Sequence, residues 1–322
     1  MGSSILVALS NHRPEIVPLA VAKMRRFDTV VLEEPPEADF RAMLAGKVAI
    51  KDYLMAVDSE YPQFSRAMCR AMRDLCRKGI SSLQIEPYLS RLMEIHERLG
   101  EGLRPETLRR DVRLWPVYQM EREATQTLVA FYKAFATGNF DTTLAAVKRF
   151  ARSDAKRFWM RDRLRAQAIA AAATDGRVYV EAGQMHVGLA SLIRRQVGRR
   201  AAVTADYLAS AVISAWSGPK MFFGPGDVLT LLYIFNPRFN GKRADLLAAR
   251  ALVQNKLLVK NEISTGLETF PHTRDELESA RIVQRLGLEG CRRLLPIVSR
   301  LGTRQARQVA MAAAGVRRDF SA

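Results

Sequence analysis

The first thirty residues alternate short apolar runs with an amphipathic stretch. Residues 5–9 form an unbroken apolar run of strand length, and residues 15–26 place apolar side chains at helical spacing. A β-branched run follows at residues 29–32. This pattern predicts a strand, a helix and a second strand, joined as a right-handed βαβ unit with a parallel strand pair.

The middle of the chain is predicted to be nearly all helical, because apolar side chains recur at helical spacing from about residue 37 to residue 175. A second strand–helix–strand segment follows, with strands at 178–180 and 201–204 around a helix at 187–197. Aligning the two segments places His12 on His186. We therefore expect an α/β fold with a mixed or parallel central sheet, built from two repeated strand–helix–strand halves.

The composition changes after Trp216, where glycine- and proline-rich turns precede helices at about 242–261, 275–286 and 289–315. Residues 273–276 have the pattern of a capping box, which would start the second of these helices. We expect two domains. Residues 1–216 form an α/β core with a large helical insertion at about 37–152, and residues 217–322 form a mainly helical C-terminal region.

Composition and charge narrow the class of protein and its partners. The 322 residues are 48% hydrophobic and 26% charged, as in ordinary globular proteins, and the three cysteines suit a reducing, cytoplasmic location. No apolar run reaches the roughly 18 residues of a membrane span. The net charge of +17 favours an anionic partner, and about half of it lies in residues 146–200. Nucleic acid is the lesser candidate, because no DNA- or RNA-binding motif is present. The sequence leaves open whether the protein forms a homo-oligomer.

Two of the four histidines are candidates for chemistry. His12 and His186 each follow a predicted buried strand, at the edge where ligands bind in open α/β sheets. A neutral imidazole there is suited to bind a metal or to act as a general base. His96 lies on an apolar helix face and His272 precedes the capping box, so we interpret both as structural.

Carboxylates and arginines are predicted near the same edge. Glu33 and Glu34 leave the second strand, and Glu181 lies in the strand that leads to His186. Two histidines with one or two carboxylates suit an open divalent-metal site. Arg161 and Arg165 lie one turn apart on the preceding helix, where they suit a substrate anion or a developing oxyanion. For Glu33 and Glu34, the alternative is that acids simply end the strand. For the arginines, the alternative is a solvated or carboxylate-paired helix face.

The order of these motifs resembles that of the TraB/TIKI family and the wider group with ChaN and erythromycin esterase-like proteins. That group is marked by two G-x-x-H motifs at strand ends, a glutamate after the next strand and an Arg-Asn or Arg-Asp helix. Residues 183–186, Gly-Gln-Met-His, match the second motif, and Arg161-Asp162 matches the helix. The first motif is degenerate, because Leu9 stands three residues before His12 where a glycine is expected.

The resemblance covers about residues 5–205 and implies that both histidines and the glutamate converge on one cleft. Members of the group are described as metal-dependent proteases, as histidine-using hydrolases and as a haem-binding protein. We therefore expect a metal-assisted hydrolase of a peptide or ester bond that uses Mn, Co or Zn. The alternative is a protein that binds a cofactor or an anionic ligand in the same cleft without turnover. The expected catalytic residues are His12, His186, Glu33, Glu34 and Arg161; the substrate contacts are Arg165 and Glu181; the metal ligands are His12, His186 and Glu33.

Overall fold

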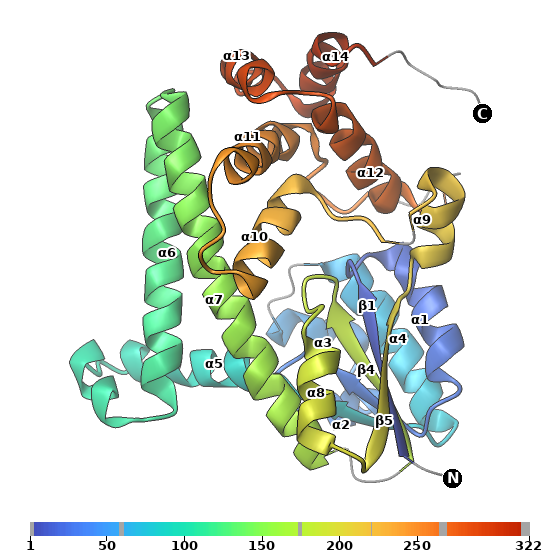
Figure 1. Ribbon diagram of the computed structural model, residues 1–322. Coiled ribbons are helices and arrows are strands. Elements are labelled where there is room, and N and C mark those ends of the chain that lie inside the picture. Colours follow the sequence, from blue (N-terminus) through green and yellow to red (C-terminus); the bar gives the residue numbers. More distant parts are fainter. Residues whose placement is uncertain (1–2, 58–60, 173–175, 220, 264–268, 317–322) are drawn as a thin grey trace. The chain divides into compact units, whose positions relative to one another are not determined.

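The computed structural model describes residues 3–57, 61–172, 176–219, 221–263 and 269–316 (Figure 1). The chain divides into two compact units: a sheet unit, Met1–Gln119 with Phe158–Met221, and a helical unit, Met120–Arg157 with Phe222–Ala322. In this division residues 120–157, which include the last part of the insertion expected at about 37–152, group with the C-terminal helices. Two of the three boundaries fall inside long helices, α6 (Leu114–Ala136) and α7 (Phe140–Ala172), and the third falls between α9 (Ser210–Ser217) and α10 (Pro225–Phe235).

A five-stranded, all-parallel sheet forms the centre of the sheet unit, in the order β3-β2-β4-β1-β5. The two central strands, β1 and β4, are buried along most of their length, as parallel strands covered on both faces are. The strands are β1 (Ser3–Ser10), β2 (Thr29–Leu32), β3 (Ser81–Gln84), β4 (Arg177–Gly183) and β5 (Ala201–Tyr207).

The two strand–helix–strand halves interleave in this sheet. The first half runs from β1 through α1 (Val17–Met24) to β2, and β4 lies between its two strands. The second half runs from β4 through α8 (Leu189–Val197) to β5, and β1 lies between its strands. The chain therefore leaves β1 and β4 in opposite directions, with α1 and α8 on opposite faces (Figure 1). Such a switch point opens a crevice at the carboxyl ends of the two strands.

One strand, β3, lies in the stretch that the hydrophobic pattern predicts to be nearly all helical. Its sequence, Ser-Ser-Leu-Gln, has no β-branched residue and no apolar run, and its pairing with β2 holds it in the sheet. The other elements of this unit are η1 (Pro14–Ile16), α2 (Phe40–Leu44), α3 (Ile50–Ala56), α4 (Pro62–Arg77), α5 (Pro87–Gly100), η2 (Pro105–Arg110) and α9 (Ser210–Ser217).

The helical unit is built around a separate apolar core of alanine, leucine and valine side chains. Its C-terminal helices are α10 (Pro225–Phe235), α11 (Lys242–Leu257), α12 (Pro271–Gln284), α13 (Leu288–Val298) and α14 (Thr303–Ala313). α12 begins at Pro271, before the expected capping box, because a proline is well suited to the first turn of a helix. Exposed charges pair around this core, for example Arg292 with Asp141 at 2.7 and 2.8 Å.

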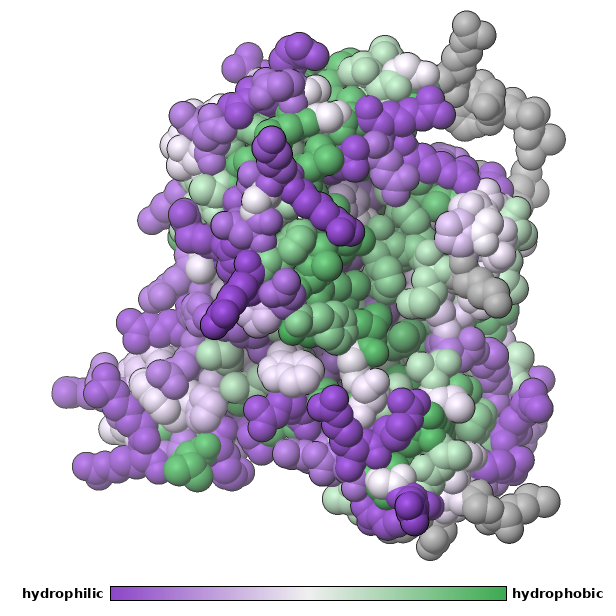
Figure 2. Space-filling model, in the orientation of Figure 1, coloured by the Kyte–Doolittle hydropathy of each residue, from purple (hydrophilic) through white to green (hydrophobic). Residues whose placement is uncertain are grey.

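Hydrophilic side chains dominate the surface over the segment that joins α5 to α6, at the lower left of Figure 2. Arg104, Arg109 and Arg110 of this segment are exposed. No helix within the described ranges is both long enough and apolar enough to cross a membrane.

Candidate active site

His12 and His186 meet at the carboxyl ends of the two central strands. Gly183 lies between them: a Cβ at this glycine would stand 3.5 Å from His12 Cε1 and 3.5 Å from His186 Cδ2. The same Cβ would lie 3.7 Å from Glu33 Oε2, at the end of β2. The switch point of the sheet therefore brings three of the expected residues to one spot.

Glu33 is the centre of this cluster, and both of its carboxylate oxygens are occupied. Oε1 lies 2.8 Å from His186 Nε2 and 3.1 Å from Arg161 Nη2. Oε2 accepts the Gly183 N–H at 2.6 Å and lies 3.2 Å from Arg165 Nη1. Burial alone would raise the pKa of Glu33, but the charges of His186, Arg165 and Arg161 outweigh it and hold this pKa well below its ordinary value.

His186 is buried between two carboxylates. Its Nε2 faces Glu33, its Nδ1 is hydrogen-bonded to Asp162 of α7, and only 3% of its side chain is exposed. Burial would lower its pKa, but the charges of Glu33 and Asp162 raise it to about 9. His186 is therefore a protonated imidazolium at neutral pH, with both ring nitrogens engaged.

His12 is held differently. Its backbone has φ of 46°, the one positive φ at a residue other than glycine among the described residues. The ring stacks on Phe64 of α4 at 5.2 Å, and 24% of the side chain is exposed. Nε2 lies 3.5 Å from Glu181 Oε1 and 4.0 Å from Glu33 Oε2, yet it has no hydrogen-bond partner in the described structure. The left-handed backbone thus presents a free ring nitrogen beside a carboxylate.

Glu181 and Arg165 support the cluster from inside the sheet. Glu181 accepts the Glu33 N–H at 3.2 Å through Oε2, which leaves Oε1 facing His12. Arg165 is fully buried and donates to the carbonyl oxygens of Ile85 at 3.0 Å and of Glu181 at 2.6 Å. Because its remaining Nη1 pairs with Glu33, Arg165 positions that carboxylate. Its expected role as a substrate contact does not agree with this burial.

Arg161 links Glu33 to a further buried carboxylate, Glu86. Its Nη2 lies 3.1 Å from Glu33 and 3.5 Å from Glu86, and 16% of its side chain is exposed. Burial would lower the pKa of Arg161, but Glu86 and Glu33 together raise it. A guanidinium so held keeps a strong positive charge beside Glu33.

Glu34 hydrogen-bonds outside the Glu33–His186 cluster but lies close enough to Glu181 for their charges to interact. Its carboxylate accepts a hydrogen bond from Gln84 at 2.9 Å, and the same amide contacts the Tyr53 hydroxyl at 3.1 Å. Burial and the nearby charge of Glu181 raise the pKa of Glu34 to about 7. This carboxyl group therefore exchanges a proton near neutral pH, which is the property of a general acid or base.

The expected metal ligands do not fit a metal in this arrangement. Both ring nitrogens of His186 and both oxygens of Glu33 are taken up by other groups, and two guanidiniums flank Glu33. Only His12 offers a free nitrogen. Among the residues that the structure describes, no group of three or more His, Cys, Asp or Glu side chains is arranged to hold a metal ion. Metal ligation by this set would require His186 to leave Glu33.

Sequence reasoning gave no role to Glu86, Asp162 or Arg13. Glu86 follows the unpredicted strand β3, and the Glu-Pro step that starts α5 was the available signal. Asp162 was part of a motif but had no assigned partner. Arg13 stacks on Tyr61 at 4.7 Å beside His12, and its Nε and Nη1 have no hydrogen-bond partner in the described ranges.

The other two histidines lie outside this cluster. His96 is exposed on α5, which corrects the expectation of an apolar, packed face. His272 is buried at the start of α12, and its Nε2 accepts the Ile263 N–H at 2.6 Å. Its contact is with the backbone of the preceding segment, as a structural histidine's would be.

Comparison with known proteins finds similarity without a described function. The chain is 27% identical over 290 residues to a protein of Archaeoglobus fulgidus described as uncharacterized; the match covers 89% of this chain and 96% of that protein. A match of this length necessarily includes parts of both units. No family model and no solved structure matches the chain.

Proposed function

We propose that the cluster at the switch point is the active site of a hydrolase that cleaves a peptide or ester bond, with His12 as the proton acceptor. The observation that carries this proposal is the contrast at Gly183. His186 is locked between two carboxylates, whereas His12 has a partly exposed ring whose Nε2 lies buried beside Glu181 without a hydrogen-bond partner in the described structure. The resemblance to the TraB/TIKI group supports the same residues.

The first step assigned to His12 is activation of water. Its Nε2 takes a proton from a water molecule while the water oxygen attacks the substrate carbonyl carbon. Glu181 Oε1, at 3.5 Å, stabilises the imidazolium that forms. Glu33 contributes to the same negative field, but its own charge is already balanced by Arg161, Arg165 and His186.

Other side chains near this cluster would stabilise the oxyanion and protonate the leaving group. Arg161 and Arg13 are placed to stabilise the oxyanion of the tetrahedral intermediate, since each retains an unpartnered N–H. Glu34, whose pKa is about 7, supplies a proton to the leaving alcohol or amine as the scissile bond breaks. The proton on His12 then returns to Glu34 through solvent, and the products are the acid and the alcohol or amine.

A divalent metal would activate water and polarise the carbonyl if it were bound here. Metal dependence stays a prediction of the resemblance, and we derive no step through a metal because the ligand set does not fit one as it stands. Chelation with EDTA, followed by addition of Mn²⁺, Co²⁺ or Zn²⁺, tests it directly. Activity restored by metal would support a rearranged site in which His186 leaves Glu33.

The experiment for the proposed function compares His12→Asn with His96→Asn. Asparagine tolerates left-handed backbone, so the first variant keeps the loop while removing the base. On a panel of chromogenic esters and fluorogenic peptides, we expect His12→Asn to lower kcat/KM by about 10²-fold or more. His96→Asn, at an exposed position, should retain the full rate. A wild-type protein inactive on the whole panel, or a fully active His12→Asn, would contradict the proposal.

A second candidate function is ligand binding without turnover in the same cleft. The observation that favours it is that both carboxylate oxygens of Glu33 and both ring nitrogens of His186 are already engaged, which leaves few free groups for chemistry. A ligand that co-purifies with the protein and is not converted would support it.

The proposed substrate is a small molecule or a peptide with an anionic group, because Arg13 is the residue after His12 and Arg161 lies 3.1 Å from Glu33, a carboxylate beside His12. A cytoplasmic location is proposed with it, since all three cysteines are free. Nucleic acid remains the lesser candidate partner.

A further inference from the structure

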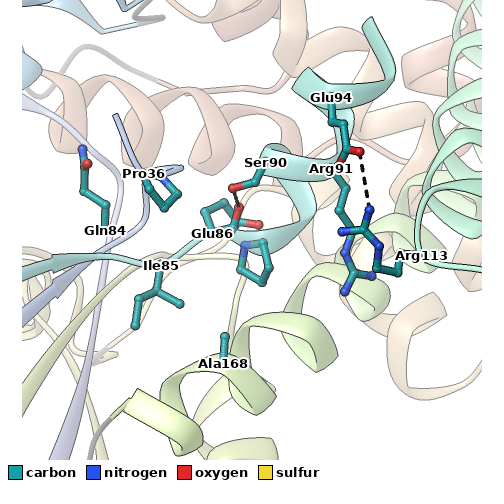
Figure 3. A pocket seen from close by; sticks show the side chains of 10 residues that line it. Pro36, Gln84, Ile85, Glu86, Ser90, Arg91, Glu94, Arg113 and Ala168 are labelled. Carbon is teal, nitrogen blue, oxygen red and sulfur yellow. Dashed lines mark hydrogen bonds and ion pairs between the residues drawn. The ribbon is translucent and has the colours of Figure 1, made fainter. Parts of the chain in front are cut away.

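A separate cavity of about 330 Å³ lies at the end of the edge strand β3 (Figure 3). It is walled on one side by Arg91 of α5 and by Arg113, and Glu86 forms part of its lining. Apolar side chains complete the lining, among them Ile85 and Ala168. The volume is typical of a site for a small organic molecule.

The two arginines of this cavity are unequally neutralised. Arg113 lies 3.4 Å from Glu94 and 3.6 Å from Asp111, as an ordinary surface ion pair. Arg91 forms no hydrogen bond or ion pair with any residue in the described ranges. Burial lowers the pKa of Arg91 and the charge of Arg113 lowers it further, against the smaller opposite effects of Asp111 and Glu94. The wall therefore carries one positive charge without a bound carboxylate, which an anionic group would neutralise.

Glu86, in the same lining, lacks a hydrogen-bond donor at one of its carboxylate oxygens. Its side chain is completely buried, and Oε2 lies 3.5 Å from Arg161 and 3.9 Å from Arg165. Oε1 has no hydrogen-bond partner within the described structure. A buried carboxylate oxygen without a donor is unfavourable, so a ligand that brings an N–H group to it gains binding energy.

We propose that this cavity binds an aliphatic α-amino acid unit, either as the free amino acid or as the C-terminal residue of a short peptide. The carboxylate faces Arg91 and Arg113, the N–H group faces Glu86, and the aliphatic side chain packs on Ile85 and Ala168. The inference rests on the cavity alone and stands whether or not the His12 site hydrolyses a bond.

The test measures binding of four related probes to the full-length protein by isothermal titration calorimetry. Leucine and N-acetyl-leucine carry both the carboxylate and the N–H group. Leucinamide lacks the carboxylate, and 4-methylpentanoate lacks the N–H group. We expect at least one of the first two to bind and each of the last two to bind about tenfold or more weakly than it. Preference for leucine indicates a free amino acid, and preference for N-acetyl-leucine indicates a peptide end.

Two variants locate the site. Arg91→Gln should weaken binding of the preferred probe by about tenfold or more, and Arg91→Lys should weaken it less because the charge remains. Arg195→Gln, at an exposed position of α8, is the matched control and should bind normally. The proposal is overturned if neither leucine nor N-acetyl-leucine binds, if leucinamide binds equally well, or if Arg91→Gln binds like the control. The probe series on the unaltered protein decides the matter even if an Arg91 variant does not fold.

Discussion

A histidine follows each of the two central strands, β1 and β4, but the two histidines differ in their surroundings and their hydrogen bonding. His12 follows β1 by two residues, stacks on Phe64 and keeps a free Nε2. His186 follows β4 by three residues and is buried between Glu33 and Asp162. The shorter turn passes through left-handed backbone at His12, whereas the longer one closes with a hydrogen bond from the His186 N–H to the Gly183 carbonyl at 3.0 Å.

The fold therefore places a histidine after each of the strands β1 and β4, and the neighbouring side chains determine what each histidine can do. The switch point brings both rings to Gly183, but among the described contacts it is His186 that pairs with Asp162 of α7. Arg161 and Arg165 of the same helix contact Glu33, the other carboxylate partner of His186. His186 contacts its two carboxylates at hydrogen-bond distance and is a fixed cation, whereas His12 lies 3.5 and 4.0 Å from its carboxylates and is available to a substrate. Variants at the two positions test whether the two histidines differ in this way.

The largest contrast should be in stability. His186→Ala leaves Asp162 buried without its histidine partner, and leaves Glu33 with the two arginines and the Gly183 N–H. Breaking a buried ion pair on one side typically costs about 3–5 kcal/mol, and we expect a loss of that size in the free energy of unfolding measured with urea. His12→Ala, at a partly exposed ring without hydrogen bonds, should change it by less than about 1 kcal/mol. Equal losses for the two variants would show that the halves are equivalent.

The second contrast is in pH dependence. The pKa of His186 is raised to about 9 in the folded protein, so its stabilising contribution is complete below the unfolded value near 6.5 and is lost as the pH rises through 9. The shift corresponds to a loss on the order of 3 kcal/mol. We expect the unfolding free energy of the wild type to fall between pH 6.5 and 9.5 by more than that of His186→Gln. Since Glu34 is present in both proteins, the difference isolates His186. Parallel pH profiles would mean that His186 is neutral.

The repeated halves were predictable because periodicity records which faces are buried. The apolar runs at 5–9 and 178–180 become the central strands, and the helical pattern at 187–197 becomes α8. β3 was not predictable in the same way. Its polar edge position leaves no period in the sequence, and pairing with β2 is a tertiary contact. The position of residues 120–157 among the C-terminal helices likewise depends on contacts distant in sequence.

The candidate site was predictable as a set of residues but not as a set of roles. Strand ends in a parallel sheet share one edge, so His12, His186 and Glu33 could be expected together. Arg165 was expected to contact a substrate anion, with a solvated or carboxylate-paired helix face as the alternative. Its burial follows from Glu33 and the carbonyl oxygens of Ile85 and Glu181, which no local pattern encodes. The saturation of Glu33, which bears on metal binding, has the same origin.

A smaller effect should appear at the strained backbone of His12. Left-handed backbone costs a residue with a Cβ about 1–2 kcal/mol relative to glycine, although glycine loses some of this gain through its greater freedom when unfolded. We expect His12→Gly to be more stable than His12→Ala by about 1 kcal/mol in urea unfolding, and His12→Asn to fall between them. If the His12→Ala variant is as stable as the His12→Gly variant, the backbone at His12 is not strained. The difference between the two turns then has no physical basis.

Gly183→Ala should have the smallest effect on stability. It also tests whether His12 and His186 face one common space at Gly183. The added methyl group would lie at ordinary contact distance, 3.5 Å, from both histidine rings, and Gly183 has no positive φ. The unfolding free energy should therefore change by no more than about 1 kcal/mol. The methyl group would nevertheless occupy the space between a fixed imidazolium and a free imidazole, where the proposed reaction takes place. We expect kcat/KM to fall by about tenfold, because a small displacement of reacting groups has a large effect on rate. Gly188→Ala is the control: its Cβ would lie 3.4 Å from Asp162 Oδ2 rather than between the rings. A Gly183→Ala protein with full activity would mean that the two histidines do not share one reaction space.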